Sequence, residues 1–335
     1  MKKADIPVID LHNDLLSFFT FKPGRSIDDP LSRSSITQLR EGSIKLQTLA
    51  IFTTTGEKSV EEARDQIDCY RKLLNEHPLA FAACRFPFDA QGPIKVLPAF
   101  ENASSFASED EPLRNAIERL ENYIRSIGPF FYITLTWNDE NRFGGGNMTT
   151  VGLKEDGKRL LEWMDGKRIA VDMSHTSDKF AYEMIDFIDK NGLDIPIIAS
   201  HSNFRAISNY PRNLPDDLAK EIVRRKGLIG LNFFAPFIHD TDPSAILRHV
   251  EYGLSLGAEN ALSFGADFFC DTDFPSLMNK YQRTVAYYPG LDNSSVYPGL
   301  LGLFAQKIGL QEEQLLNIAS RNALRFLDRI QIFRG

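Results

Sequence analysis

The segment VIDLHNDLL, residues 8–16, is an apolar, strand-like run that ends in polar side chains. Alternate residues of a strand point to the same side, so Asp10, His12 and Asp14 share one side of this strand. Three polar groups on one side are unfavourable in an apolar core, because each must find a partner when it is buried. They are a favourable start for a metal site, and the other strands of the chain decide between these interpretations.

Seven further apolar runs follow, and the sequence predicts eight strands, at residues 7–12, 44–52, 94–100, 130–136, 168–173, 195–200, 228–233 and 261–266. Several are almost continuously apolar, which is typical of parallel strands buried on both faces. Amphipathic patterns predict helices at residues 58–76, 111–126, 152–165, 177–191, 215–226, 243–257, 299–308 and 311–329. This alternation indicates an α/β fold, a (β/α)8 TIM barrel. A doubly wound open sheet is the alternative, but its usual Gly-rich turn after the first strand is absent.

The composition restricts the partners and the compartment. The 335 residues are 43% hydrophobic and 25% charged, as in an ordinary globular protein, and the net charge is 38 − 45 = −7. Nucleic acid is a poor partner, because phosphate binding needs clustered Lys and Arg. Three scattered cysteines without a CxxC pair fit a reducing compartment. No apolar run is long enough to span a membrane and the N-terminus has no apolar h-region, so we expect one cytoplasmic domain over residues 1–335, without a membrane partner.

A TIM barrel carries its chemistry at the carboxyl ends of the strands. The polar residues expected at these ends are His12, Asp14, Glu101, His175, His201 and Asp267. Imidazoles and carboxylates without thiolates suit zinc or a similar divalent ion. Five ligands are too many for one tetrahedral catalytic zinc, but they suit two ions that share a bridging carboxylate. Such a pair would turn a bridging water into hydroxide and neutralise the oxyanion formed at a carbonyl, while Asp267 could carry the water's proton to a leaving nitrogen.

Several motifs occur in a recognisable order: DLHNDLL, a Glu after the third strand, DMSH, SHSNFRAISNYPRNLPDD, GADF and ASRNALRFL. Together they resemble the renal, or membrane, dipeptidase family of zinc metallopeptidases within the amidohydrolase superfamily, over about residues 7–329. The resemblance implies two zinc ions per chain, one bound by His12 and Asp14, the other by His175 and His201, with Glu101 as the bridging ligand. It implies hydrolysis of L-Xaa-L-Xaa or L-Xaa-D-Xaa dipeptides by a metal-bridging hydroxide, with Asp267 and Glu101 as the catalytic residues.

The resemblance also implies substrate contacts, and here the chain departs from the family. Arg212, in YPRN, would bind the C-terminal carboxylate of the dipeptide, and Asp267 would be the acid and base. Where the family commonly has a His that contacts the substrate, this chain has Trp137, whose indole only donates a hydrogen bond. Trp137 would contact the substrate or narrow the pocket. The family's DFDG reads DFFC here, with Phe269 and Cys270.

Other interpretations remain open at this point. Glu101 could cap the next helix, each histidine could be a satisfied core residue, and Arg212 could pair with Asp216 or Asp217. The FFAPF segment, residues 233–237, could line the pocket or only pack in the core.

At the level of function, the same binuclear site could serve an N-acyl amino acid amidohydrolase or a lactam- or lactone-opening hydrolase. A metal-stabilised binding protein without activity is a third interpretation. A homodimer is expected from the family and from the loop aromatics Tyr281, Tyr287 and Tyr288.

Overall fold

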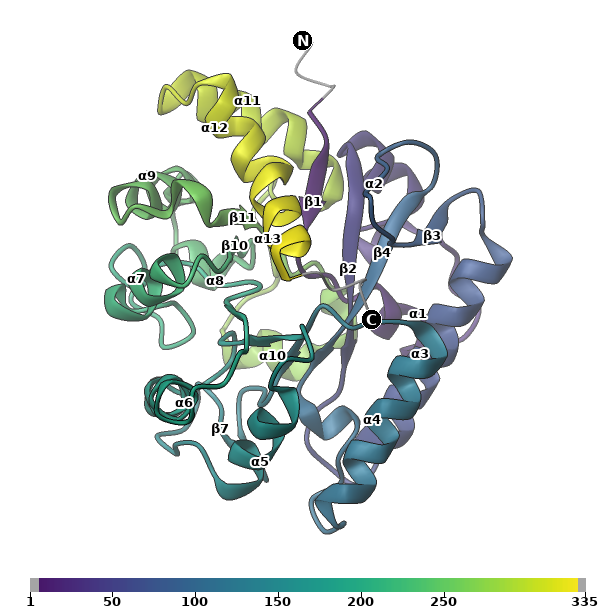
Figure 1. Ribbon diagram of the computed structural model, residues 1–335. Coiled ribbons are helices and arrows are strands. Elements are labelled where there is room, and N and C mark those ends of the chain that lie inside the picture. The colour runs from purple at the N-terminus through teal and green to yellow at the C-terminus, as the bar shows by residue number, and fades with distance from the viewer. Residues whose placement is uncertain (1–5, 331–335) are drawn as a thin grey trace.

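The computed structural model describes residues 6–330 and contains a barrel of parallel strands surrounded by helices (Figure 1). Its eight strands are β1 Val8–Asp10, β2 Ile44–Phe52, β4 Ile94–Glu101, β5 Tyr132–Thr134, β8 Ala170–Asp172, β9 Ile197–Ile198, β10 Ile229–Leu231 and β11 Leu262–Phe264. They are hydrogen-bonded in the order β10-β11-β1-β2-β4-β5-β8-β9. A parallel bridge between Ala199 and Ile229 joins the two outer strands, so the barrel closes there. The eight predicted strands and the TIM-barrel prediction are confirmed, and the open-sheet alternative is wrong.

The predicted helices are also present. They are α3 Ser59–Glu76, α4 Leu113–Ile127, α5 Glu155–Met164, α6 Asp178–Asn191, α7 Asp216–Arg224, α9 Ala245–Ser255 and α11 Tyr297–Lys307. The helix expected at 311–329 consists of α12 Glu312–Leu316, a π-helical turn over Asn317–Arg321 and α13 Asn322–Ile330. Figure 1 shows α3 and α4 side by side against the outside of β2 and β4. Their buried faces cover the strands, as the amphipathic pattern requires.

The structure adds short elements that the sequence pattern did not predict. They are the helices α1 Leu15–Phe21, α2 Ile36–Glu41, α8 Ala235–Ile238 and α10 Pro275–Lys280, the strand β3 Phe81–Ala83, which pairs with β4, and the two-residue strands β6 Glu140–Asn141 and β7 Gly144–Gly145. Most lie in the connections between barrel elements. Two of them, α8 and α10, follow β10 and β11 and carry residues of the candidate site.

Apolar side chains seal the amino-terminal end of the barrel. Leu46, Leu97 and Phe131 fill the barrel interior at this end and pack with Phe326 and Leu327 of α13. The rings of Phe131 and Phe326 lie 6.0 Å apart. Helix α13 therefore closes the amino-terminal end of the barrel, and the carboxyl end is the open one.

At the carboxyl end, two glycines let β9, β10 and β11 approach one another closely. A Cβ atom on Gly230 would lie 1.8 Å from the carbonyl oxygen of Ser200, and one on Gly265 would lie 1.9 Å from the same oxygen. Only a glycine fits at such a distance. These contacts fix the backbone at Ser200 and therefore the position of His201.

Candidate active site

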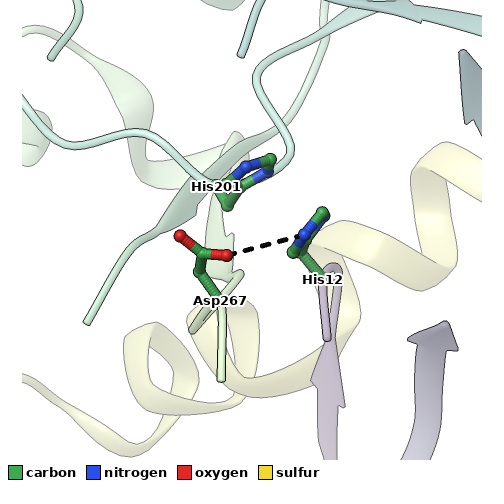
Figure 2. Close-up of side chains that lie close together, drawn as sticks. All are labelled: His12, His201 and Asp267. Carbon is green, nitrogen blue, oxygen red and sulfur yellow. Dashed lines mark ion pairs between the residues drawn. The ribbon is translucent and has the colours of Figure 1, made fainter. Parts of the chain in front are cut away.

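The six polar side chains that the sequence places at strand ends converge in one buried cluster at the carboxyl end of the barrel, and each is at most 8% exposed. His12 and Asp14 follow β1, Glu101 is the last residue of β4, and His175, His201 and Asp267 follow β8, β9 and β11. Figure 2 shows three of them, His12, His201 and Asp267, facing one another from separate segments. The prediction that they meet at the barrel mouth agrees with this placement.

Glu101 lies in the middle of the cluster with its two carboxylate oxygens directed to different partners. Its Oε1 is 2.9 Å from Nε2 of His175 and 3.7 Å from Nε2 of His201. Its Oε2 is 3.2 Å from Nε2 of His12. A carboxylate that divides its oxygens in this way has the disposition of a bridging ligand, and Glu101 does not cap a helix, because Asn102 caps the following turn.

The donor atoms form groups in which a cation fits. Atoms of His12, Asp14 and Glu101 lie within 4.8 Å of one another, and so do atoms of Glu101, His175 and His201. Nε2 of His12 and Oδ1 of Asp14 are buried without any hydrogen-bond partner. A buried polar atom without a partner is costly, so these atoms are suited to a metal ion. His12, His201 and Asp267 form a third such group.

Two residues of the cluster adopt backbone angles that residues other than glycine usually avoid. The φ angle is 66° at His175 and 63° at Asp267. Left-handed conformations of residues other than glycine cost on the order of 1–3 kcal/mol and concentrate at functional sites. Here they turn both side chains into the barrel mouth immediately after the strands end.

The second ring nitrogen of His12 and of His175 is held by a neighbour. Nδ1 of His12 is 2.6 Å from the hydroxyl of Tyr132, which donates its own proton to the carbonyl oxygen of Leu11. Nδ1 of His175 is 2.9 Å from Oδ1 of Asn138, which can only accept. In both rings Nδ1 therefore carries the proton, and Nε2 offers its lone pair to the cluster.

His201 is oriented by a relay of two residues. Asp172 accepts from the backbone N–H and the hydroxyl of Ser200, and this hydroxyl lies 2.6 Å from Nδ1 of His201. Because Ser200 donates its proton to Asp172, it accepts from Nδ1–H of His201, and Nε2 again keeps a free lone pair. A carboxylate behind a ligand histidine is the usual way to fix a metal-binding imidazole.

Asp267 is positioned from several directions. Its Oδ2 accepts a 2.8 Å hydrogen bond from Nδ2 of Asn232, and its Oδ1 lies 3.6 Å from Nε2 of His12 (Figure 2). Its carbonyl oxygen accepts a hydrogen bond from the hydroxyl of Tyr287. One carboxylate oxygen is thus fixed, and the other faces the cluster.

Burial controls the protonation of the cluster. It raises the pKa of Glu101 to about 8, and it raises that of Asp267 to about 6. It raises the pKa of Asp14 well above its usual value, and the charge of Glu101 adds to the effect. Burial lowers the pKa of His175 and His201 well below the usual value, so both imidazoles are neutral at pH 7. Without a cation, burial favours the protonated carboxyl groups and the neutral imidazoles of this cluster. A bound cation would favour the ionised carboxylates.

Arg212 is buried beside the cluster rather than on the surface. Its Nη1 donates to Oγ of Ser202 at 2.7 Å, its Nη2 donates to the carbonyl of His201 at 2.9 Å, and its Nε has no partner. The alternative pairing is wrong, because Asp216 accepts from Tyr252 and Asp217 from Tyr182. The charge of Arg212 lies close enough to lower the pKa of Glu101.

Trp137 lines the cavity above the cluster. Its ring centroid lies 6.0 Å from that of His175 and 5.1 Å from that of Phe52. Phe234 and Phe237 of the FFAPF segment line the same cavity, and Phe269 does so as well. The altered loop after β11 therefore contributes to the cavity wall.

Two further residues need comment. Tyr287, taken as an exposed loop aromatic, is buried and hydrogen-bonded to Asp267, so it offers no support for a dimer interface. His249, outside the cluster, is a core histidine whose ring nitrogens contact the carbonyl of Ile238 and the N–H of Phe204.

Sequence reasoning missed the supporting residues. Asn138 and Ser200 each adjoin a residue that the sequence had singled out, so strand-end position was an available signal. Tyr132 gave no signal, because it lies 120 positions from His12 in the chain. Asp10, which shares a strand face with His12, accepts hydrogen bonds from His12 N, Ala266 N and the hydroxyl of Tyr297 instead of joining the cluster.

A family model described as membrane dipeptidase, peptidase family M19, matches residues 3–334. The chain belongs to this family. It is therefore a metallodipeptidase, a hydrolase that acts on peptide bonds, and the family implies metal ions, for which the clustered donors are suited. No helix in the described part of this M19 chain is long and apolar enough to cross a membrane.

Individual relatives of this chain are distant in sequence. An uncharacterized dipeptidase of Schizosaccharomyces pombe is 25% identical over 95% of this chain and 80% of its own length. An uncharacterized protein of Acinetobacter calcoaceticus is 34% identical, over 39% of this chain and 43% of its own length. A metallopeptidase from Rhodobacter sphaeroides, crystallised with a phosphinate mimic of the dipeptide L-Ala-D-Ala, has a TM-score of 0.79 at 20% identity, covering 97% of this chain and 99% of that one. This last likeness concerns the fold.

Proposed function

We propose that the chain is a zinc-dependent dipeptidase that hydrolyses L-Xaa-L-Xaa or L-Xaa-D-Xaa dipeptides with two zinc ions per chain. His12 and Asp14 would hold one ion, His175 and His201 the other, and Glu101 both. The observation that carries the proposal is the division of the Glu101 oxygens between two histidine groups. The phosphinate mimic of L-Ala-D-Ala in the similar Rhodobacter structure supports the dipeptide as substrate.

When bound, the ions would supply Lewis acidity, which activates a water and offsets negative charge that develops on the carbonyl oxygen of the substrate. Asp267 would take the proton of the attacking water and return it to the amine that leaves. A pKa of about 6 suits this exchange near neutral pH, because the group can both gain and lose the proton. The hydrogen bond from Asn232 leaves Oδ1 of Asp267 free to do so.

Arg212 would bind the carboxylate of the dipeptide. Its Nε–H has no partner, and Nη1 and Nη2 each use only one of their two N–H groups, so the guanidinium still has donors for a carboxylate. The hydrogen bonds to Ser202 and to the His201 carbonyl hold the guanidinium beside the cluster. The group that binds the substrate is therefore positioned by the segment that carries a metal-ligand candidate, His201.

The test measures metal and activity on the same purified sample. We expect about two equivalents of zinc and cleavage of a panel of dipeptides, both lost on chelation and regained when zinc is added back. Fully metallated protein that cleaves no member of the panel would falsify the proposal.

A second function is an N-acyl amino acid amidohydrolase or a lactam- or lactone-opening hydrolase with the same binuclear site. Trp137 favours it, because an indole in the cavity wall cannot exchange protons with a free amino group. Paired measurements on dipeptides and their N-acetylated forms distinguish the two. Much faster cleavage of the free dipeptides excludes the second function.

A further inference from the structure

The cavity above the cluster has an unusual wall. Its floor contains Asp14, Glu101, His175 and Asp267. The rest of the lining comes from the last residue of β2 and from the segments after β5, β10 and β11, and it consists of Phe52, Trp137, Asn138, Phe234, Phe237, Phe269, Phe274, Leu277 and Tyr281. Seven of these nine residues are aromatic, and none is charged.

On one side of the cavity, the aromatic rings form a connected series. Trp137 packs edge-to-face on Phe52 at 5.1 Å, and Phe52 packs on Phe274 at 6.1 Å. Phe274 in turn contacts Phe269 at 5.4 Å with nearly perpendicular rings. Offset and edge-to-face contacts at these separations are favourable, so this side is a preformed apolar surface.

The series continues on the other side. Phe269 lies 5.7 Å from Phe234, which contacts Phe237 at 4.9 Å and Tyr281 at 5.1 Å. The wall therefore runs without interruption from Trp137 to Tyr281 around the polar floor. We call these seven residues the aromatic collar: Phe52, Trp137, Phe234, Phe237, Phe269, Phe274 and Tyr281.

The collar offers little to a polar substrate side chain. Oδ1 of Asn138, the one amide in the wall, already lies at hydrogen-bond distance from His175. Arg212 is not part of the lining, and in the proposed function it binds the C-terminal carboxylate that all dipeptides share, so it is not a partner for a substrate side chain. An acidic side chain that enters the collar would lose its hydration without gaining a cationic side chain of the wall as a partner, which is strongly unfavourable.

We infer that this site selects dipeptides with apolar side chains and discriminates against those with acidic side chains. The inference rests on the proposed dipeptidase function and specifies its substrates. The floor reacts with the peptide bond common to all dipeptides, and the collar distinguishes them by what surrounds that bond. Burial of each additional methylene in such a wall favours the apolar substrate further.

The test uses side chains with the same branching and the same number of non-hydrogen atoms but different polarity. Values of kcat/KM are measured for Leu-Ala, Asn-Ala and Asp-Ala, and for Ala-Leu, Ala-Asn and Ala-Asp, with the zinc-loaded enzyme. In at least one of the two positions we expect Leu to exceed Asp by roughly tenfold or more, with Asn between them. Asn and Asp have the same shape and nearly the same size, so size cannot explain a difference between these two.

A pair of variants locates the effect. Leu277, on α10, lines the cavity, whereas Leu303, on α11, is 43% exposed and lies outside its lining. Leu277→Arg should lower the Leu-to-Asp ratio of kcat/KM severalfold, because it supplies a cationic partner for the carboxylate. Leu303→Arg adds the same charge elsewhere and should leave the ratio unchanged.

Each outcome has a distinct meaning. Cleavage of dipeptides with Asp and Leu within threefold of each other in both positions overturns the inference and leaves the dipeptidase function intact. An equal shift of the ratio in both Arg variants also overturns it, since the net charge would then be responsible. If none of the six dipeptides is cleaved, the proposed function itself is wrong.

Discussion

The two ends of the barrel are built in opposite ways. At the amino-terminal end, Leu46, Leu97 and Phe131 pack with Phe326 and Leu327 of α13 in a sealed apolar cluster. At the carboxyl end, the interior is filled by imidazoles and carboxylates, some of whose buried atoms have no partner.

This difference separates stability from chemistry within one sheet. Apolar burial at the sealed end stabilises the fold. The polar end holds left-handed residues at His175 and Asp267 and carboxylates with raised pKa values, all of which cost stability. Substitutions at the two ends should therefore affect different measurements, and the following experiments test that separation in order of decreasing effect.

The largest effect is expected for Asp267→Asn. Loss of the proton carrier should lower kcat by about 10²- to 10⁴-fold, while zinc content stays the same. Metal analysis and steady-state kinetics on one sample measure both quantities. Asp240→Asn, which removes an exposed carboxylate, is the matched control and should keep normal kcat. Loss of zinc in Asp267→Asn would assign Asp267 to the metal ligands, a role that its proximity to His12 and His201 also allows.

At the sealed end, Phe326→Ala should act on stability alone. Removing a buried aromatic ring that packs on Phe131 costs about 3–5 kcal/mol of unfolding free energy. Denaturant unfolding measures this loss, and kcat/KM of the folded fraction should stay close to that of the unsubstituted protein. A large fall in kcat/KM without a loss of stability would contradict the separation of the two ends.

A smaller effect is expected for Ser200→Ala, which should weaken the metal site that contains His201. The variant breaks the relay from Asp172 to the imidazole, and loss of such a support lowers metal affinity about 10- to 100-fold. Zinc titration against a competing chelator measures it. Ser263→Ala is the control, since the Ser263 hydroxyl is buried without a hydrogen-bond partner. Equal zinc affinity in the two variants would show that the relay does not support the metal.

The smallest expected effect is a pH dependence of the stability of the metal-free protein. In the metal-free protein the pKa of Glu101 is about 8, above its ordinary value, so at pH 7 the folded state holds a proton that the unfolded state has released. The folded state thus binds more protons, and this contribution to stability is present below about pH 4.5 and is lost as the pH rises through 8.

Zinc binding near pH 7 should consequently release protons. Calorimetric titrations in buffers of different ionisation enthalpy count them. Glu101→Gln, which cannot ionise, should flatten the dependence of metal-free stability on pH between 4.5 and 8. A metal-free wild-type protein that becomes more stable over this range, relative to Glu101→Gln, would contradict the sign of the shift.

Much of the fold was predictable because its pattern is local. Long apolar runs such as β2 and β4 and amphipathic helices such as α3 and α6 have periodicities that survive without tertiary context. The short elements were missed for the same reason. Helix α8 has four residues with a proline among them, and α10 has six, too few for a periodic signal.

The sequence by itself determined which residues stand at the ends of strands, and with them the metal-binding candidates, because strand alternation and residue chemistry are local properties. Tertiary structure decided that Tyr132, Asn138 and Ser200 orient the three imidazoles and that Tyr287 is buried. It also decided that aromatic residues from four separate segments form one wall. Those outcomes depend on contacts between segments far apart in the chain, such as the 120 positions between His12 and Tyr132. Barrel closure sets these distances, and no local pattern contains them.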